Sequence, residues 1–268
     1  MLDSQGLKSY LKDYESLFQV YQRQNKEKAL QYLEGLFHDG KHNIERMNER
    51  IEQSDYQQLH HFISVSPWDH NLVLSAVRRD ISILFEGGSS LTGLILDESG
   101  HRKSGKKSVG VARQYLGSIG KVDNGQVAVF AALSQDDDVA MVDTRLYLPK
   151  VWTEDSKRCK KAGIPEQGAI YRTKPALALQ MIQQMGVEVK YDWVGGDSIY
   201  GNSKALRQGL QKLGKLFVMD VGENLEVFTQ DPKPYIPASK PGKGRKKSSY
   251  VRELKAVKVK KIYDKKRH

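Results

Sequence analysis

Cysteine is almost absent from this sequence of 268 residues, and long apolar runs are absent altogether. The single cysteine, Cys159, excludes a disulfide within the chain, so a reducing cytoplasm is the expected location. No stretch approaches the ~20 apolar residues that a membrane helix needs. The first residues also lack the layout of a signal peptide. We therefore expect a cytoplasmic protein without a membrane partner.

An uneven distribution of charge points to a polyanionic partner. The chain has a net charge of +11, and residues 238–268 hold 13 Lys and Arg against 2 Asp and Glu, which leaves the remainder neutral. A basic segment is typical of proteins that bind nucleic acid. A basic end that only improves solubility would have the same composition, so charge alone does not decide between the two.

The pattern of apolar residues changes near residue 88 and divides the chain into parts. Residues 1–88 are predicted to be all-helical, because apolar residues recur at helical spacing from Leu7 to Tyr21, from Leu30 to Phe37 and from Leu72 to Phe85. Ser66 and Pro67 are typical of a helix start, as cap and first helical residue. Residues 232–268 are rich in Pro, Gly, Ser and Lys and are predicted to be a basic linker or tail.

Residues 89–231 alternate between predicted strands and helices. The order is three strands, helix, strand, helix, strand, which favours an α/β fold with a mixed sheet flanked by helices. The predicted strands are 94–97, 127–133, 139–148, 191–194 and 216–221, and the predicted helices are 175–185 and 203–213.

Two aspartates, Asp97 and Asp197, follow apolar strands in this part of the chain. If the two strands are neighbours, both carboxylates emerge at one edge of the sheet. Carboxylates held close together repel each other, and a divalent cation relieves that repulsion. Mg²⁺ prefers oxygen ligands and often binds one or two protein carboxylates together with a substrate phosphate. A strand that ends in aspartate is common, however, so this pattern alone is a weak signal.

Longer motifs around the two aspartates make the signal specific. Between Gln58 and Lys247 the sequence closely resembles the DDE insertion-sequence transposases of the RNase H-like superfamily. The resemblance is carried by KSVGVARQYLG at 107–117, GKVDNGQV at 120–127, RLYLP at 145–149 with Trp152, AGIP at 162–165, TKP at 173–175 and GDSIYG at 196–201.

The resemblance implies an RNase H-like catalytic domain that cleaves and transfers DNA strands at transposon ends with Mg²⁺ or Mn²⁺. It assigns Asp97 and Asp197 to the first two positions of the acidic triad, as catalytic residues and metal ligands. Double-stranded DNA, from transposon ends and target, becomes the expected partner. A homodimer is compatible with it, and association with the nucleoid is the expected location.

The third acid of the triad is not identifiable in the sequence. The family carries it as a glutamate on a helix well beyond the last core strand, and the glutamates that follow Asp197 here are Glu223, Glu226 and Glu253. None of them lies in a convincing match to that helix. A C-terminally truncated transposase is therefore expected, and a DNA-binding fragment without catalytic activity is the alternative. An unrelated nuclease with the same fold is a third, weaker option.

Basic and polar residues near Asp97 are the candidates for contact with DNA, because phosphate carries the main charge of DNA. A solvated basic loop or internal hydrogen bonding would explain the same residues. Tyr200, close to Asp197, is a candidate for stacking on a base. The predicted DNA-binding residues are Lys103, Lys106, Lys107, Arg113, Gln114, Lys121, Lys246 and Lys247.

Overall fold

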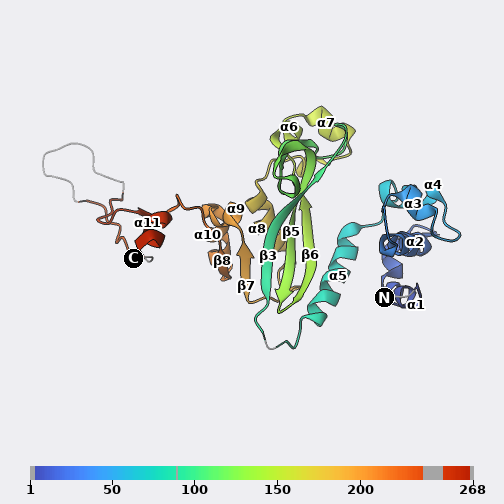
Figure 1. Cartoon of the computed structure of the whole chain (residues 1–268), viewed down its shortest axis with the longest axis horizontal. Coiled ribbons are helices and arrows are strands. Elements are labelled where there is room, and N and C mark those ends of the chain that lie inside the picture. The colour runs from blue at the N-terminus through green and yellow to red at the C-terminus, as the bar shows by residue number, and fades with distance from the viewer. Residues whose placement is uncertain (1–3, 89, 238–249, 266–268) are drawn as a thin grey trace. The chain divides into compact units, whose positions relative to one another are not determined.

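The computed structural model describes residues 4–88, 90–237 and 250–265 (Figure 1). The chain divides into two compact units, Met1–Glu86 and Gly87–His268. We refer to them as the N-terminal and C-terminal units and describe each by itself. Lys246 and Lys247 lie outside the described residues.

The N-terminal unit is mainly helical, as predicted. One prediction is wrong: the helical spacing from Leu7 to Tyr21 does not form one helix. A 3₁₀ helix ends at Phe18, and a two-stranded hairpin follows, in which Tyr21 has φ 53 and is 90% exposed. The elements are α1 (Ser4–Leu11), the 3₁₀ helix (Lys12–Phe18), β1 (Gln19–Val20), β2 (Arg23–Gln24), α2 (Lys26–Phe37), α3 (Ile44–Asn48), α4 (Tyr56–Ser64) and α5 (His70–Leu84).

Three aromatic rings form the centre of this unit. The ring of Phe18 lies 5.9 Å from that of Phe62 and 5.6 Å from that of Trp68, measured between centroids. The indole N–H of Trp68 donates a hydrogen bond to the carbonyl oxygen of Phe62 at 2.9 Å, so its one polar group is satisfied. Burial of these rings joins the 3₁₀ helix, α4 and the start of α5.

Helix α5 begins later than Ser66 and Pro67 predict. Its N-cap is Asp69, whose carboxylate accepts a hydrogen bond from the backbone N–H of Asn71 at 2.8 Å. The hydroxyl of Ser66 instead accepts a hydrogen bond from the side chain of Asn25 at 3.2 Å. Aspartate caps a helix as well as serine does, and here it stands directly before the first helical residue.

The C-terminal unit contains a six-stranded mixed sheet. Strands β6, β5 and β3 are antiparallel neighbours, and β7 and β8 follow beside β3 in parallel, which is the strand arrangement of the RNase H-like fold. The sequence did not predict β4, which is polar and pairs with the first residues of β5. The strands are β3 (Gly93–Arg102), β4 (Ala112–Leu116), β5 (Lys121–Gln135), β6 (Asp138–Leu146), β7 (Trp193–Gly196) and β8 (Leu216–Met219).

Helices α8 and α10 cover one face of this sheet. Helix α8 contacts β5 and β6, and α10 contacts α8 and β8. They bury leucine, isoleucine and methionine side chains against strand residues such as Leu94, Leu96 and Val129. The α-helices described in this unit are α6 (Lys150–Thr153), α7 (Ser156–Lys161), α8 (Lys174–Met185), α9 (Ser198–Gly201), α10 (Lys204–Lys212) and α11 (Val259–Lys265).

The opposite face of the sheet is exposed at both edges among the described residues of this unit, and we call it the open face. In one row across the sheet, Met141, Ala132, Ile95, Gly195 and Val218 lie side by side on neighbouring strands. Met141 is 53% exposed and Val218 is 71% exposed, so the two ends of the row are uncovered. Side chains alternate between faces along a strand, so Asp97, two residues after Ile95, belongs to this open face.

The end of the described chain pairs with the segment that follows the sheet. Strand β10 (Val257–Lys258) runs antiparallel to β9 (Glu226–Val227), and Tyr235 and Val251 form an isolated bridge. Within the described ranges, no helix has the length and apolar character to cross a bilayer.

Close backbone approach at the end of α9 provides a test of the fold. A Cβ atom on Gly201 would lie 1.8 Å from the carbonyl oxygen of Asp220, which directly follows β8. We therefore expect Gly201→Ala to lower the free energy of unfolding by about 1–3 kcal/mol, measured by urea denaturation. Gly117→Ala is the matched control, because nothing lies within 4 Å of its Cβ position. Equal stability of the two variants would contradict this packing.

Candidate functional site

Parallel pairing of β3 with β7 brings Asp97 and Asp197 together. Leu96 lies opposite Gly196 in the last pair of the β3–β7 ladder, and each aspartate is the next residue of its chain segment. Neighbouring strands lie about 4.8 Å apart. The prediction that Asp97 ends its strand is wrong, because β3 continues to Arg102 and Asp97 pairs with Phe130 of β5. Asp97 instead marks the point where β7 separates from β3.

Each of the two carboxylates is fixed by one backbone hydrogen bond. Oδ1 of Asp97 accepts from the backbone N–H of Glu98 at 2.7 Å, and Oδ1 of Asp197 accepts from the N–H of Ile199 at 2.9 Å. Asp197 is thereby the N-cap of α9. Both residues are exposed. Two accessible carboxylates that directly follow the last pair of the β3–β7 ladder fit a cation such as Mg²⁺, which takes oxygen ligands and keeps several waters.

A half-buried ion pair lies next to the two aspartates. Oε1 of Glu98 is 2.8 Å from Nζ of Lys174, the first residue of α8, and Oε2 accepts a hydrogen bond from the hydroxyl of Tyr200 at 3.0 Å. Burial raises the pKa of Tyr200 far above its usual range, and the carboxylates of Glu98, Asp97 and Asp197 raise it further. The hydroxyl of Tyr200 therefore stays protonated and serves as a donor.

This arrangement corrects the expectation that Tyr200 stacks on DNA. The side chain is fully buried and hydrogen-bonded to Glu98, so no base can reach its ring. Sequence reasoning also missed Glu98 and Lys174 as neighbours of the site. For Glu98, the alternation of side chains along a strand was an available signal. Because Glu98 directly follows Asp97, its side chain lies on the other face of the sheet, which is the covered one.

No third ligand joins the two aspartates among the residues that the structure describes. Within these ranges there is no group of three or more His, Cys, Asp or Glu side chains that could hold a metal ion. Glu223 forms an ion pair with Lys260 at 3.4 Å, and Glu226 lies in β9 opposite Lys258. Both glutamates thus pair with residues of the C-terminal segment.

The predicted DNA-binding residues near Asp97 gather at one end of the sheet. Lys103, Lys106 and Lys107 follow β3, Arg113 is in β4, and Lys121 begins β5. From Asp97 to the end of β3 at Arg102 is about 17 Å at the rise of an antiparallel strand. The basic residues therefore do not surround the aspartates, contrary to the interpretation of the sequence. They lie farther along the same strands.

Amide side chains form hydrogen bonds to the loop between β3 and β4 (residues 103–111), which we call the basic loop. Asn124 donates hydrogen bonds to the carbonyl oxygens of Lys103 and Gly105 at 2.6 and 2.7 Å, and Gln114 donates to those of Gly110 and Gly125 at 3.2 and 2.7 Å. Backbone carbonyls of a loop need such partners when no ladder supplies them. The amide of Gln114 is thus engaged within the loop.

Helix α7 extends the basic surface and was missed by sequence reasoning. Arg158 donates a hydrogen bond to the carbonyl oxygen of Lys106 at 2.7 Å and stacks on the Trp152 ring, with 3.7 Å between its guanidinium carbon and the ring centroid. This links α7 to the basic loop (Figure 1). Three exposed lysines project from the same helix, namely Lys157, Lys160 and Lys161.

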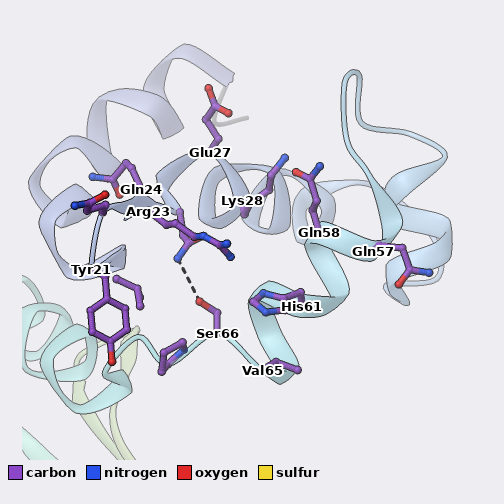
Figure 2. Close-up of a pocket in the computed structure, with 14 residues that line it drawn as sticks. Tyr21, Arg23, Gln24, Glu27, Lys28, Gln57, Gln58, His61, Val65 and Ser66 are labelled. Carbon is purple, nitrogen blue, oxygen red and sulfur yellow. Dashed lines mark hydrogen bonds between the residues drawn. The ribbon is translucent and has the colours of Figure 1, made fainter.

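The N-terminal unit contains a separate polar cleft of about 1310 Å³. One wall is the β1–β2 hairpin with the start of α2, and the other is α4 with the segment that leaves it (Figure 2). The side chains of Arg23 and His61 point into the space between the walls (Figure 2). Most of the remaining lining is hydrogen-bonding, including Gln22, Gln24, Lys28 and Gln58.

The mixed sheet flanked by helices is that of an RNase H-like α/β protein, as predicted. The chain matches the model of the DDE superfamily endonuclease family over residues 14–267 and belongs to that family. It is also 33% identical over 194 residues to a protein of Microchaete diplosiphon described as "Probable transposase for insertion sequence element IS701". That match covers 70% of this chain and 47% of the relative, so the chain spans about half of its relative's length. No solved structure matches the chain.

Proposed function

We propose that this chain acts as a transposase, cleaving and transferring DNA strands at transposon ends by metal-dependent phosphoryl transfer. The proposal depends on the β3–β7 register, because Asp97 and Asp197 each directly follow its last pair, Leu96–Gly196. Membership of the DDE endonuclease family and the likeness to a transposase support it. Residues 89–231 hold the catalytic site in this proposal, residues 1–88 recognise DNA, and residues 232–268 add basic contacts.

The residues of the site would act by binding and orientation. Asp97 and Asp197 would hold Mg²⁺ or Mn²⁺ through the carboxylate oxygens that their backbone hydrogen bonds leave available. Such ions activate a water or a 3′-hydroxyl and stabilise the leaving oxygen of the phosphodiester. Both aspartates are exposed, so a DNA phosphate can approach them from solvent.

A second candidate is a DNA-binding protein without cleavage activity. It is favoured by the described ranges, which contain no group of three or more acidic, histidine or cysteine side chains that could hold a metal ion. The two candidates share the DNA contacts and differ in the chemistry.

Neutralising Asp97 separates the two candidates. The substrate is a labelled duplex that carries the DNA flanking the chain's own gene, incubated with the full chain and Mn²⁺. The transposase proposal predicts strand cleavage by the wild type, cleavage at background level for Asp97→Asn, and unchanged DNA affinity for both. Asp136→Asn is the matched control, because this aspartate lies in the turn between β5 and β6. Binding without cleavage by the wild type would leave the second candidate.

The basic surface formed by the loop after β3 and by α7 is the proposed contact for DNA phosphates. Lys106 and Lys107 are exposed, and the hydrogen bond from Arg158 holds their loop against α7. The surface begins beyond the end of β3, which is about 17 Å or five base-pair steps from Asp97, so one duplex could extend from Asp97 to the start of this surface. Lys103, Arg113 and Lys121 would add contacts at the same end.

Charge reversal on α7 tests this contact. We expect the double variant Lys160→Glu and Lys161→Glu to weaken binding of the full chain to any duplex. The slope of log affinity against log salt concentration should also fall by about 1.8, because two phosphate contacts are lost. Lys212→Glu, an exposed lysine at the end of α10, is the control for a change of charge elsewhere. A slope equal to that of the wild type would remove α7 from the DNA path.

The polar cleft of the N-terminal unit is the proposed surface for reading DNA sequence. This unit carries 10 Lys and Arg against 13 Asp and Glu, so its overall charge does not attract phosphate. The cleft instead offers Arg23 and several glutamines, and arginine and glutamine form paired hydrogen bonds with guanine and adenine edges.

Arg23→Ala therefore has a different expected effect from the α7 variants. It should reduce the difference in binding free energy between the chain's own flanking DNA and a scrambled duplex by about 1–3 kcal/mol. The slope of log affinity against log salt concentration should stay nearly unchanged. Competition binding measures the preference. Arg46→Ala is the control, since Arg46 lies outside the cleft and pairs with Glu49. An unchanged preference in Arg23→Ala would show that the cleft does not read sequence.

A further inference from the structure

Glu98 occupies a position that connects both aspartate-bearing segments. It follows Asp97 on β3, but alternation turns its side chain to the face covered by α8. Its side chain is 15% exposed, and each of its two oxygens has a partner, Lys174 or Tyr200. A carboxylate in such a setting is costly to desolvate unless it is paired on both oxygens, which is the case here.

The partner Tyr200 belongs to the helix that Asp197 caps. Helix α9 comprises only Ser198–Gly201, and Asp197 is its N-cap. The β3–β7 ladder ends at Leu96 and Gly196, directly before the two aspartates. Beyond that last pair, the hydrogen bond from the Tyr200 hydroxyl to Glu98 links α9 to β3.

Packing makes the backbone before Asp197 depend on Tyr200. A Cβ atom on Gly196 would lie 3.1 Å from the Cβ of Tyr200, so the tyrosine packs directly on the backbone that leads into Asp197. Tyr200 is fully buried and has little freedom to move independently. A displacement of Tyr200 from Glu98 therefore shifts α9 and its cap.

We propose that Glu98 is a positioning residue, which holds Asp197 at the correct distance from Asp97 through its hydrogen bond with Tyr200. Lys174 neutralises Glu98, so a third carboxylate can lie near the pair without repelling it. This inference rests on the proposed function, since it assumes that Asp97 and Asp197 share a divalent cation. Glu98 acts through Tyr200 and is not itself a ligand.

The test measures Mn²⁺ binding to the full chain, with the signal of free Mn²⁺ followed by electron paramagnetic resonance. Tyr200→Phe removes only the hydroxyl and changes no charge. We expect it to weaken Mn²⁺ binding by about 10-fold or more, the usual range for residues that orient metal ligands. Tyr191→Phe is the matched control, because the buried hydroxyl of Tyr191 has no hydrogen-bond partner among the described residues; its affinity should equal that of the wild type.

A second variant distinguishes positioning from a simple effect of charge. Glu98→Gln should also weaken Mn²⁺ binding, and adding Tyr200→Phe to it should cause little further loss, because the shared hydrogen bond is already disturbed. If Glu98 acted only by its charge, Tyr200→Phe alone would bind Mn²⁺ like the wild type. That result would overturn the inference.

Fe²⁺-directed backbone cleavage gives a readout that a loss of global stability would not reproduce. Hydroxyl radicals formed at the bound Fe²⁺ should cut the wild-type chain near both residue 97 and residue 197. In Tyr200→Phe, cutting should persist near 97 and decline near 197. Equal cutting at both places in this variant would contradict the positioning role.

Asp97→Asn separates failure of the inference from failure of the proposed function. It should abolish saturable Mn²⁺ binding. If Asp97→Asn binds Mn²⁺ like the wild type, the proposed metal site is wrong and the inference falls with it. If Asp97→Asn loses binding while Tyr200→Phe and Glu98→Gln keep it, the metal site stands and the positioning role is wrong.

Discussion

The parallel pairing of β3 with β7 is the constraint on which the candidate site depends. Asp97 and Asp197 are a hundred positions apart in sequence, and the pair Leu96–Gly196 is what makes them neighbours. A shift of this register by one residue would turn one of the two side chains to the other face of the sheet. The buried residues Leu94 and Val194, which form another pair of the same ladder, resist such a shift because both lie against the helices.

The two faces of β3 divide the tasks of the site. The open face carries Asp97 and is accessible to a substrate. The covered face carries Glu98, whose partners Lys174 and Tyr200 come from α8 and α9. At the basic end of the sheet, Asn124 and Gln114 donate hydrogen bonds to carbonyl oxygens of the loop after β3.

Elements with strong local signals were predictable from the sequence. Helix α8 has Thr173 as its N-cap with a proline in its first turn, α10 has Ser203 as its cap, and β7 is a short apolar strand that leads to Asp197. Elements that depend on tertiary pairing were not predictable. Strand β4 is polar, and its pairing with β5 is what makes it a strand. The links from Glu98 to Lys174 and Tyr200 span 76 and 102 positions, and no local pattern indicates them.

The central claim is that Asp97 and Asp197 share one divalent cation at the end of the β3–β7 ladder. The most direct measurement is a crystal structure of the full chain soaked in Mn²⁺, with anomalous scattering used to locate the ion. We expect an anomalous peak within ligand distance of carboxylate oxygens of both aspartates, about 2.0–2.1 Å for a cation as small as Mg²⁺. A peak at another acidic cluster, with none between Asp97 and Asp197, would contradict it.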